Sequence, residues 1–249
     1  MSGHSKWSTI KRKKGAADAK RGRLFSRLNK EILLAARDGG GDPNANIRLR
    51  NAIAAAKAAN MPKDTIARAV KKGTGELDGG ANFEEITYEG YGPAGVAVLV
   101  CTFTDNRNRT TAEVRHAFNK YAGNLGENGC VSWMFDRKGM ITFNTEDVEM
   151  GQLEETAIEN GAEDIKEDGD VVEVTSAIED FPGLQEAFDN SGMKYEEAQL
   201  TYVPQTTVKL EGKQAETMLK LIEQLEELDD VSDVYGNFDI SDEEMERLS

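Results

Sequence analysis

The chain has 249 residues, of which 39% are hydrophobic, enough for two or three domains that fold without disulfide or metal staples. Its net charge of −15, taken as a whole, argues against a polyanion as partner. The longest apolar run, residues 96–101, is far shorter than the roughly 20 residues of a membrane-spanning helix, and the basic N-terminus lacks the apolar stretch of a secretory signal. We therefore expect a cytoplasmic protein without a membrane partner, in which Cys101 and Cys130 stay reduced thiols.

The first 77 residues predict a small helical domain. Apolar residues recur at three- and four-residue spacing over residues 17–37, and the glycines at 39–41 end that helix. A second helix is expected to begin at Asp42-Pro43, a capping residue followed by a proline that the first turn tolerates, and to end before residue 60. A third helix is expected over residues 62–73, where two lysines near its end complement the helix dipole.

After a glycine-rich linker, short apolar or alternating segments are interspersed with helical stretches, a pattern typical of α/β domains. The expected strands are residues 83–89, 96–104, 132–135, 139–143, 170–175, 197–202 and 231–238. The expected helices are residues 108–121, 146–159, 178–190 and 213–227. This number of elements favours two compact α/β units over a single one.

The net charge hides two oppositely charged parts. Residues 1–75 hold 18 Lys plus Arg against 5 Asp plus Glu, a net charge of +13, whereas the remainder holds 12 against 40, a net charge of −28. The basic part can therefore meet a polyanion from one pole of the molecule. The acidic part is either a solvated face or a surface that docks basic proteins, and the solvated face is the commoner case.

Cations surround a tryptophan in the N-terminal tract. Phosphates need positive charge and unstacked bases need a flat aromatic face, so a segment with both predicts binding of looped or single-stranded RNA. The alternative is a solvated basic tail whose tryptophan packs on the helices. The candidate nucleic-acid-binding residues of the tract are His4, Lys6, Trp7, Lys11, Arg12, Lys13, Lys14, Lys20, Arg21 and Arg23.

A second polar segment, residues 104–110 (TDNRNRT), lies where a strand leads into a helix. Arg107 and Arg109 are further candidate nucleic-acid-binding residues, because the rest of this region is acidic. They either contact phosphate or pair with neighbouring carboxylates, and the sequence leaves both alternatives open. Asp105 is expected to cap the helix.

The sequence contains partial matches to catalytic and ligand-binding motifs, but none of them is complete. Residues 90–95 fit G-x-G-x-x-G, yet a strand follows where the dinucleotide motif needs a helix, so we expect a turn between strands. Residues 164–170 hold acids at calcium-loop spacing, but Lys166 and Thr175 occupy ligand positions, so we expect a hairpin turn. The scattered histidines and cysteines predict no metal, and no nucleophile or phosphate loop is found. We expect no cofactor, no small-molecule substrate and no catalysis, and an enzyme with a carboxylate site of no linear signature stays the remaining hypothesis.

Seven short segments together carry a resemblance to a known family. They are residues 3–7 (GHSKW), 10–11 (IK), 88–93 (YEGYGP), 104–110 (TDNRNRT), 113–116 (EVRH), 124–127 (NLGE) and 131–135 (VSWMF). With them the sequence resembles, over nearly its whole length, the YebC/PmpR family, which includes the mitochondrial translational activator of cytochrome c oxidase. It departs from the family pattern in two turns, where Ala94 replaces a second glycine and Tyr121-Ala122 precede Gly123 in place of a glycine pair.

The resemblance implies an α+β multidomain fold with a basic N-terminal three-helix domain and two sandwich-like α/β domains, one inserted in the other. The expected domains are residues 1–77, residues 78–133 together with 206–249, and the inserted residues 134–205. It also implies a non-enzymatic regulator of gene expression. Members are described either as translation factors on the ribosome, which ease synthesis through proline runs, or as transcriptional regulators that bind DNA. Trp7 amid lysines favours RNA, such as rRNA or tRNA at the ribosome, and a DNA-binding regulator that uses the same domain is the alternative.

Overall fold

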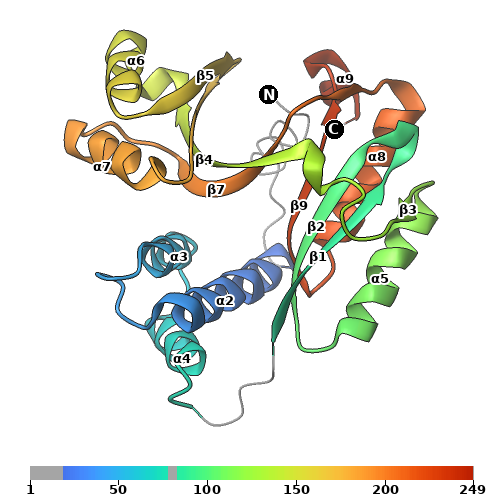
Figure 1. Ribbon diagram of the computed structural model, residues 1–249, viewed down its shortest axis with the longest axis horizontal. Helices are drawn as coiled ribbons and strands as arrows, with labels where there is room; N and C mark the ends of the chain where they lie inside the picture. Colours follow the sequence, from blue (N-terminus) through green and yellow to red (C-terminus); the bar gives the residue numbers. More distant parts are fainter. Residues whose placement is uncertain (1–18, 78–82, 249) are drawn as a thin grey trace.

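The computed structural model describes residues 19–77 and 83–248, which form three packed units (Figure 1). The first unit is a bundle of the helices α2 (Ala19–Gly39), α3 (Ile47–Ala58) and α4 (Lys63–Gly73). The apolar stripes of these helices face one another, and Ile32, Leu49 and Ile66 are buried between them. The predicted N-terminal helical domain is confirmed.

Asn46 joins two helices of this bundle and sets where α3 begins. Its Oδ1 accepts a hydrogen bond from the N–H of Leu49 at 3.0 Å, and its Nδ2 donates to the carbonyl of Ala35 in α2 at 2.7 Å. The helix start predicted at Asp42-Pro43 is wrong, because the Asp42 carbonyl closes a turn with the N–H groups that follow it. The capping side chain is the amide of Asn46, so α3 begins one residue after it.

A four-stranded antiparallel sheet forms the centre of the second unit. Its strands are β1 (Glu84–Tyr91), β2 (Ala97–Thr104), β3 (Asn124–Leu125) and β9 (Val231–Gly236), in the spatial order β3-β1-β2-β9. The helices α5 (Arg107–Lys120) and α8 (Gly212–Glu226) cover one face, where Val98, Val100, Met218 and Ile222 lie in a common core. The unit also contains the 3-10 helix η1 (Pro93–Gly95), the parallel pair β8 (Val208–Lys209) and β10 (Phe238–Asp239), and the helix α9 (Asp242–Leu248).

The chain between β3 and β8 builds a second antiparallel sheet, so the third unit is inserted into the second (Figure 1). Its strands are β4 (Phe135–Asn144), β5 (Ala162–Asp168), β6 (Val171–Ser176) and β7 (Glu197–Pro204), in the order β5-β6-β4-β7. The helices α6 (Met150–Glu159) and α7 (Phe181–Ser191) pack on it, after a 3-10 turn η3 (Thr145–Asp147). The predicted α+β fold with one unit inserted in another is confirmed. The domain boundaries after residues 77, 133 and 205 stay a prediction.

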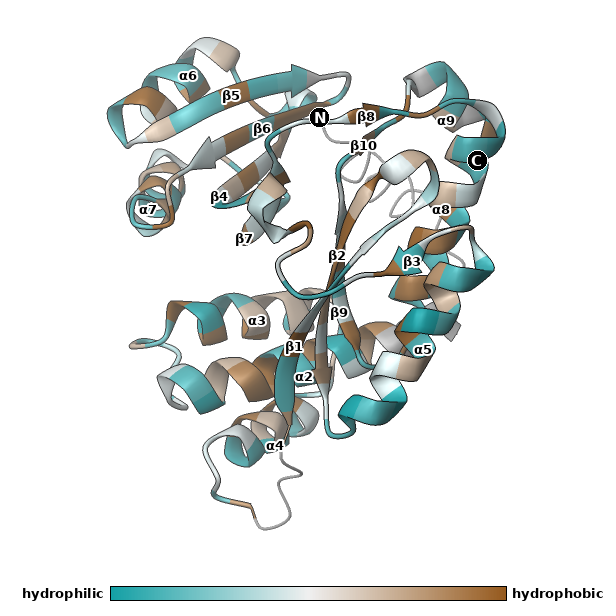
Figure 2. Cartoon of the chain, turned by 45° about the vertical axis from the view of Figure 1, so that its right-hand side comes forward, coloured by the Kyte–Doolittle hydropathy of each residue, from teal (hydrophilic) through white to brown (hydrophobic). Residues whose placement is uncertain are grey.

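Strand β2 is buried on both faces, as a continuous apolar run is expected to be. One face lies under α5 and α8. On the other face, Ala97 contacts the inserted unit through Phe135, and Phe103 packs against Leu33 and Leu34 of α2. Figure 2 shows this apolar strand running between α2 and the inserted unit. The second face of β2 is therefore the surface on which all three units meet.

The strand predicted over residues 132–135 is wrong. These residues form the 3-10 helix η2 (Ser132–Met134), and β4 begins only at Phe135. The cause is the buried Glu89, whose carboxylate accepts hydrogen bonds from the N–H groups of Val131 at 2.8 Å and Ser132 at 2.7 Å. Amide groups bound in this way are not available to a strand partner.

Two predicted turns are confirmed. The glycine-rich residues 90–95 end β1 and lead through η1 into β2. The acidic residues 164–170 lie in the β5–β6 hairpin, whose turn contains Gly169 with a φ of 61°. In residues 19–77 and 83–248, none of the helices is both long enough and apolar enough to span a lipid bilayer.

Candidate nucleic-acid interface

Helix α2 is fixed to the second unit by three of its cations. The guanidinium of Arg27 pairs with Asp233, and the ammonium of Lys30 lies 3.2 Å from Asp230 and donates to a neighbouring backbone carbonyl. Arg37 donates to the carbonyl of Phe83 at 3.0 Å and lies 3.3 Å from the carboxylate of Glu85. These cations are neutralised within the molecule.

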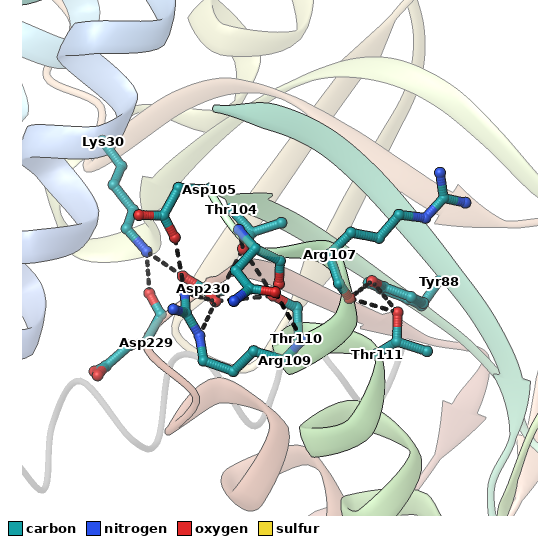
Figure 3. Close-up of polar contacts among 11 residues, drawn as sticks. Lys30, Tyr88, Thr104, Asp105, Arg107, Arg109, Thr110, Thr111, Asp229 and Asp230 are labelled. Carbon is teal, nitrogen blue, oxygen red and sulfur yellow. Dashed lines mark hydrogen bonds and ion pairs between the residues drawn. The ribbon is translucent and has the colours of Figure 1, made fainter. Parts of the chain in front are cut away.

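Asp230 is the centre of a polar cluster at this docking surface (Figure 3). It is 4% exposed, and its Oδ2 lies 2.6 Å from the guanidinium of Arg109, 2.8 Å from the hydroxyl of Thr110 and 3.1 Å from that of Thr104. Its other oxygen accepts from Lys30. Burial alone would raise the pKa of Asp230, but the hydrogen bonds from Arg109 and Thr110 and the charge of Lys30 hold it below its usual value.

The two arginines of the segment 104–110 have different partners. Arg109 pairs with Asp230 and, at 3.0 Å, with Asp105, so of the two alternatives left open by the sequence, pairing with carboxylates applies to Arg109. Arg107 contributes only its backbone carbonyl, which accepts from Tyr88 and Thr111. Its guanidinium is exposed, extends away from Asp230 (Figure 3), and has no carboxylate partner within the part of the chain that the structure describes.

The cap predicted for α5 is one residue off. Asn106, and not Asp105, caps the helix, because its Oδ1 accepts from the N–H of Arg109 at 3.1 Å. Asp105 binds the guanidinium of the same arginine. The segment therefore holds Arg109 from two sides and leaves Arg107 facing solvent.

The basic tract predicted at the N-terminus falls mostly outside the described residues. This applies to His4, Lys6, Trp7, Lys11, Arg12, Lys13 and Lys14. Lys20, Arg21 and Arg23 lie in the first turns of α2, and their side chains are also outside the described set. Their role in nucleic-acid binding stays a prediction.

The structure adds a set of cations that the sequence analysis did not single out. They are exposed, they lie on α3 and α4, and no ion pair joins them to any carboxylate in residues 19–77 or 83–248: Lys57, Lys63, Arg68 and Lys71. By contrast Arg48 on the same α3 pairs with Glu31 at 2.9 Å and with Asp38 at 3.3 Å. Helical periodicity could have predicted that two of these cations are exposed, because Arg68 and Lys71 lie on the side of α4 opposite the buried Ile66 and Ala69.

The described residues hold no cluster of three or more His, Cys, Asp or Glu side chains that could bind a metal ion. Cys101 and Cys130 are both free thiols. Burial and the nearby charge of Asp233 raise the pKa of Cys101 to about 12, so this thiol is a poor nucleophile.

Comparison with known proteins covers both parts of the chain. Residues 5–76 match the TACO1/YebC protein N-terminal domain, and residues 83–238 match the TACO1/YebC second and third domain. The chain is 58% identical over 249 residues to a "probable transcriptional regulatory protein" of Syntrophus aciditrophicus, with all of both chains covered. It is 60% identical over 248 residues to one of Geobacter sulfurreducens, again with full coverage.

A solved structure shares the fold. The crystal structure of a conserved hypothetical protein from Aquifex aeolicus is 49% identical in sequence, with a TM-score of 0.83. The match covers 91% of this chain and 93% of that one. The full-length matches and this shared architecture place the chain in the TACO1/YebC family, whose curated relatives are named as regulatory proteins.

Proposed function

We propose that this protein regulates gene expression by binding nucleic acid through its helical N-terminal unit, with RNA at the ribosome as the target and without catalysis. The names of its relatives support a regulatory role. A polyanion partner is supported by the way the cations of the helical unit divide into two sets.

The division of these cations carries the proposal. Arg27, Lys30 and Arg37 of α2 face the acidic second unit and are paired there. The cations of α3 and α4 defined above face solvent without carboxylate partners inside the described residues. Solvated cations break no ion pair within the protein when they bind phosphates. Binding releases the small counterions of the nucleic acid, and this release drives association.

RNA is favoured over duplex DNA by the N-terminal tract, in which Trp7 offers a stacking face amid lysines. A transcriptional regulator that binds DNA with the same unit is the second candidate, supported by the printed names of the relatives. Both candidate functions use the same cations, so substitutions on this surface do not distinguish them. They are distinguished by which nucleic acid the protein binds.

A variant with four alanines tests the surface: Lys57→Ala, Lys63→Ala, Arg68→Ala and Lys71→Ala. Its matched control removes three exposed lysines and one exposed arginine from the acidic part: Arg115→Ala, Lys194→Ala, Lys209→Ala and Lys213→Ala. The two variants have the same net charge, so a difference between them reports the location of the charge and not its sum.

Binding is measured to a single-stranded RNA, to random duplex DNA and to ribosomes by co-sedimentation, each over a series of salt concentrations. We expect the α3–α4 variant to bind RNA at least about tenfold more weakly, with a log affinity against log salt slope shallower by about 3. The control is expected to bind like the wild type. Equal behaviour of the two variants refutes the surface, and a strong preference for one promoter over RNA and random duplex favours the DNA candidate.

A further inference from the structure

Arg50 is an exposed arginine of α3 whose guanidinium group is held by the backbone of its own unit. Its Nε donates to the carbonyl of Pro43 at 3.0 Å, and its Nη2 donates to the carbonyl of Asn44, also at 3.0 Å. Both carbonyls belong to the turn that precedes α3. The orientation of the guanidinium plane is therefore fixed, although the residue is exposed to solvent.

The two hydrogen bonds occupy only one edge of this plane. A guanidinium group carries five N–H groups. The edge formed by Nε and Nη2 of Arg50 faces the turn. The edge at the tip, formed by Nη1 and the second N–H of Nη2, makes no hydrogen bond to any residue in 19–77 or 83–248. Two parallel N–H groups of this kind match two oxygens of a phosphate group.

Arg50 also keeps its charge, because both of its acceptors are neutral. Arg48, on the same helix, is held by carboxylates instead: its Nε lies 2.9 Å from Glu31 and its Nη1 lies 3.3 Å from Asp38. No ion pair joins Arg50 to a carboxylate in the part of the chain that the structure describes. The carboxylate nearest along the chain, Asp42, accepts an N–H group of its own turn at 2.9 Å. The positive charge of Arg50 is thus both fixed in place and unpaired.

Arg50 lies on the same side of α3 as Lys57, which belongs to the nucleic-acid surface proposed above. The two residues are seven positions apart, which corresponds to two helical turns and about 10 Å along the axis. Arg48 lies on the other flank of the exposed face, because two residues turn an α-helix by about 200°. Arg50 therefore extends the surface on α3 and α4, whereas Arg48 does not.

A side chain that is fixed before binding loses less entropy when it binds. Free lysines such as Lys57 and Lys71 have flexible stems, and a contact with phosphate has to order them. The guanidinium group of Arg50 is already ordered by the two carbonyls of the turn. Contacts of this kind position a nucleic-acid backbone without reading its sequence.

We infer that Arg50 is a phosphate-binding residue, which binds one phosphodiester group of a nucleic acid on the tip edge of its guanidinium while the other edge stays on the turn. This role rests on the proposed function and adds to it the residue that fixes where a phosphate lies. RNA and duplex DNA share the phosphodiester group, so both are ligands of Arg50.

Three variants of the full chain test this role. Arg50→Ala removes the guanidinium group, and Arg50→Lys keeps the charge without the planar pair of N–H groups. Arg48→Ala is the matched control, since it removes one positive charge from the same helix at a residue that is already paired. Binding to a single-stranded RNA and to random duplex DNA is measured by fluorescence anisotropy over a series of salt concentrations, and thermal unfolding checks that each variant is folded.

Arg50→Ala is expected to bind both nucleic acids about tenfold more weakly, with a slope of log affinity against log salt that is shallower by about 1, because one phosphate contact is lost. Arg50→Lys is expected to keep the wild-type slope but to bind about threefold more weakly, because an ammonium group lacks the planar pair of donors. Arg48→Ala is expected to keep the slope and to stay within about twofold of the wild-type affinity. A purely structural role of Arg50 would lower the unfolding temperature of Arg50→Ala without changing its slope.

Equal effects of Arg50→Ala and Arg48→Ala on binding overturn the role of Arg50 and leave the proposed function in place, and so does wild-type affinity in Arg50→Lys. Absence of nucleic-acid binding by the wild type overturns the proposed function, and this role with it. Vesicles of phosphatidylglycerol present a phosphodiester group on a lipid. If Arg50→Ala weakens binding to these vesicles and not to nucleic acid, the assignment to nucleic acid is wrong.

Discussion

Replacing Asp230 with asparagine is expected to lower the free energy of unfolding by about 2–3 kcal/mol. The carboxylate is 4% exposed and faces Arg109, Lys30 and two threonine hydroxyls, all of them donors. An amide of the same size loses the charge and turns an NH2 group towards these donors. Breaking a buried ion pair costs about 3–5 kcal/mol, and a cost at or just below the low end of that range is expected here because the side chain of Arg109 is 45% exposed and can be rehydrated.

Asp233→Asn provides the matched control for this substitution. Asp233 lies in β9, which begins directly after Asp230, and pairs with Arg27, but the two side chains are 32% and 52% exposed. Pairs with this exposure contribute less than about 1 kcal/mol. Urea unfolding followed by circular dichroism measures both variants. If Asp230→Asn costs no more stability than Asp233→Asn, the reasoning from burial is wrong.

The wild type and Asp230→Asn can also be compared as a function of pH, and the pKa shift of Asp230 fixes the direction of the expected change. The pKa of Asp230 in the folded protein lies below its unfolded value of about 3.9. Its contribution to stability is therefore fully present above the unfolded pKa and is lost as the pH falls through the folded pKa. We expect the stability difference between the wild type and Asp230→Asn to be constant near neutral pH and to shrink in acid. A difference that grows on acidification contradicts the assignment.

Three further outcomes follow from groups described above. Glu89→Gln is expected to cost about 2–3 kcal/mol, because an amide cannot accept all three backbone N–H groups, and hydrogen exchange should quicken at those amides. Ala94→Gly and Ala122→Gly, at φ angles of 58° and 57°, should each raise the free energy of unfolding by about 0.5–1 kcal/mol in urea melts. At pH 8, iodoacetamide should label the half-buried Cys130 before Cys101, whose thiol pKa is raised by burial to about 12, and mass spectrometry of the digested protein reads the order.

The sequence predicts best those elements whose cause is local. The apolar stripe of α8 is visible as Met218, Leu221, Ile222 and Leu225 at helical spacing, and all four are fully buried. The two-residue strands β3 and β8 carry no such stripe, because each is defined by a partner far away in the chain. The strand expected over residues 132–135 failed for the same reason, since the carboxylate that captures its amides belongs to β1.

The sequence predicted the positive charge of the candidate site, but it did not predict which of its cations form ion pairs within the protein. Counting charges separates a basic from an acidic part, and it treats Arg27, Lys30 and Arg37 as free cations. The structure docks the two parts through these residues, so the unpaired surplus is smaller than the count. The choice between phosphate and carboxylate for Arg109 also depends on Asp230, 121 residues away, which no local pattern identifies.

Strand β2 sets the distance between the two units that pack on its second face. The inserted unit rests on it at Ala97 and the helical bundle at Phe103, on the same side of an extended backbone that is itself clamped by α5 and α8. Six residues of strand correspond to about 20 Å. Because both attachments share one extended strand, the inserted unit and the helical bundle are held at a set separation on the same side of β2.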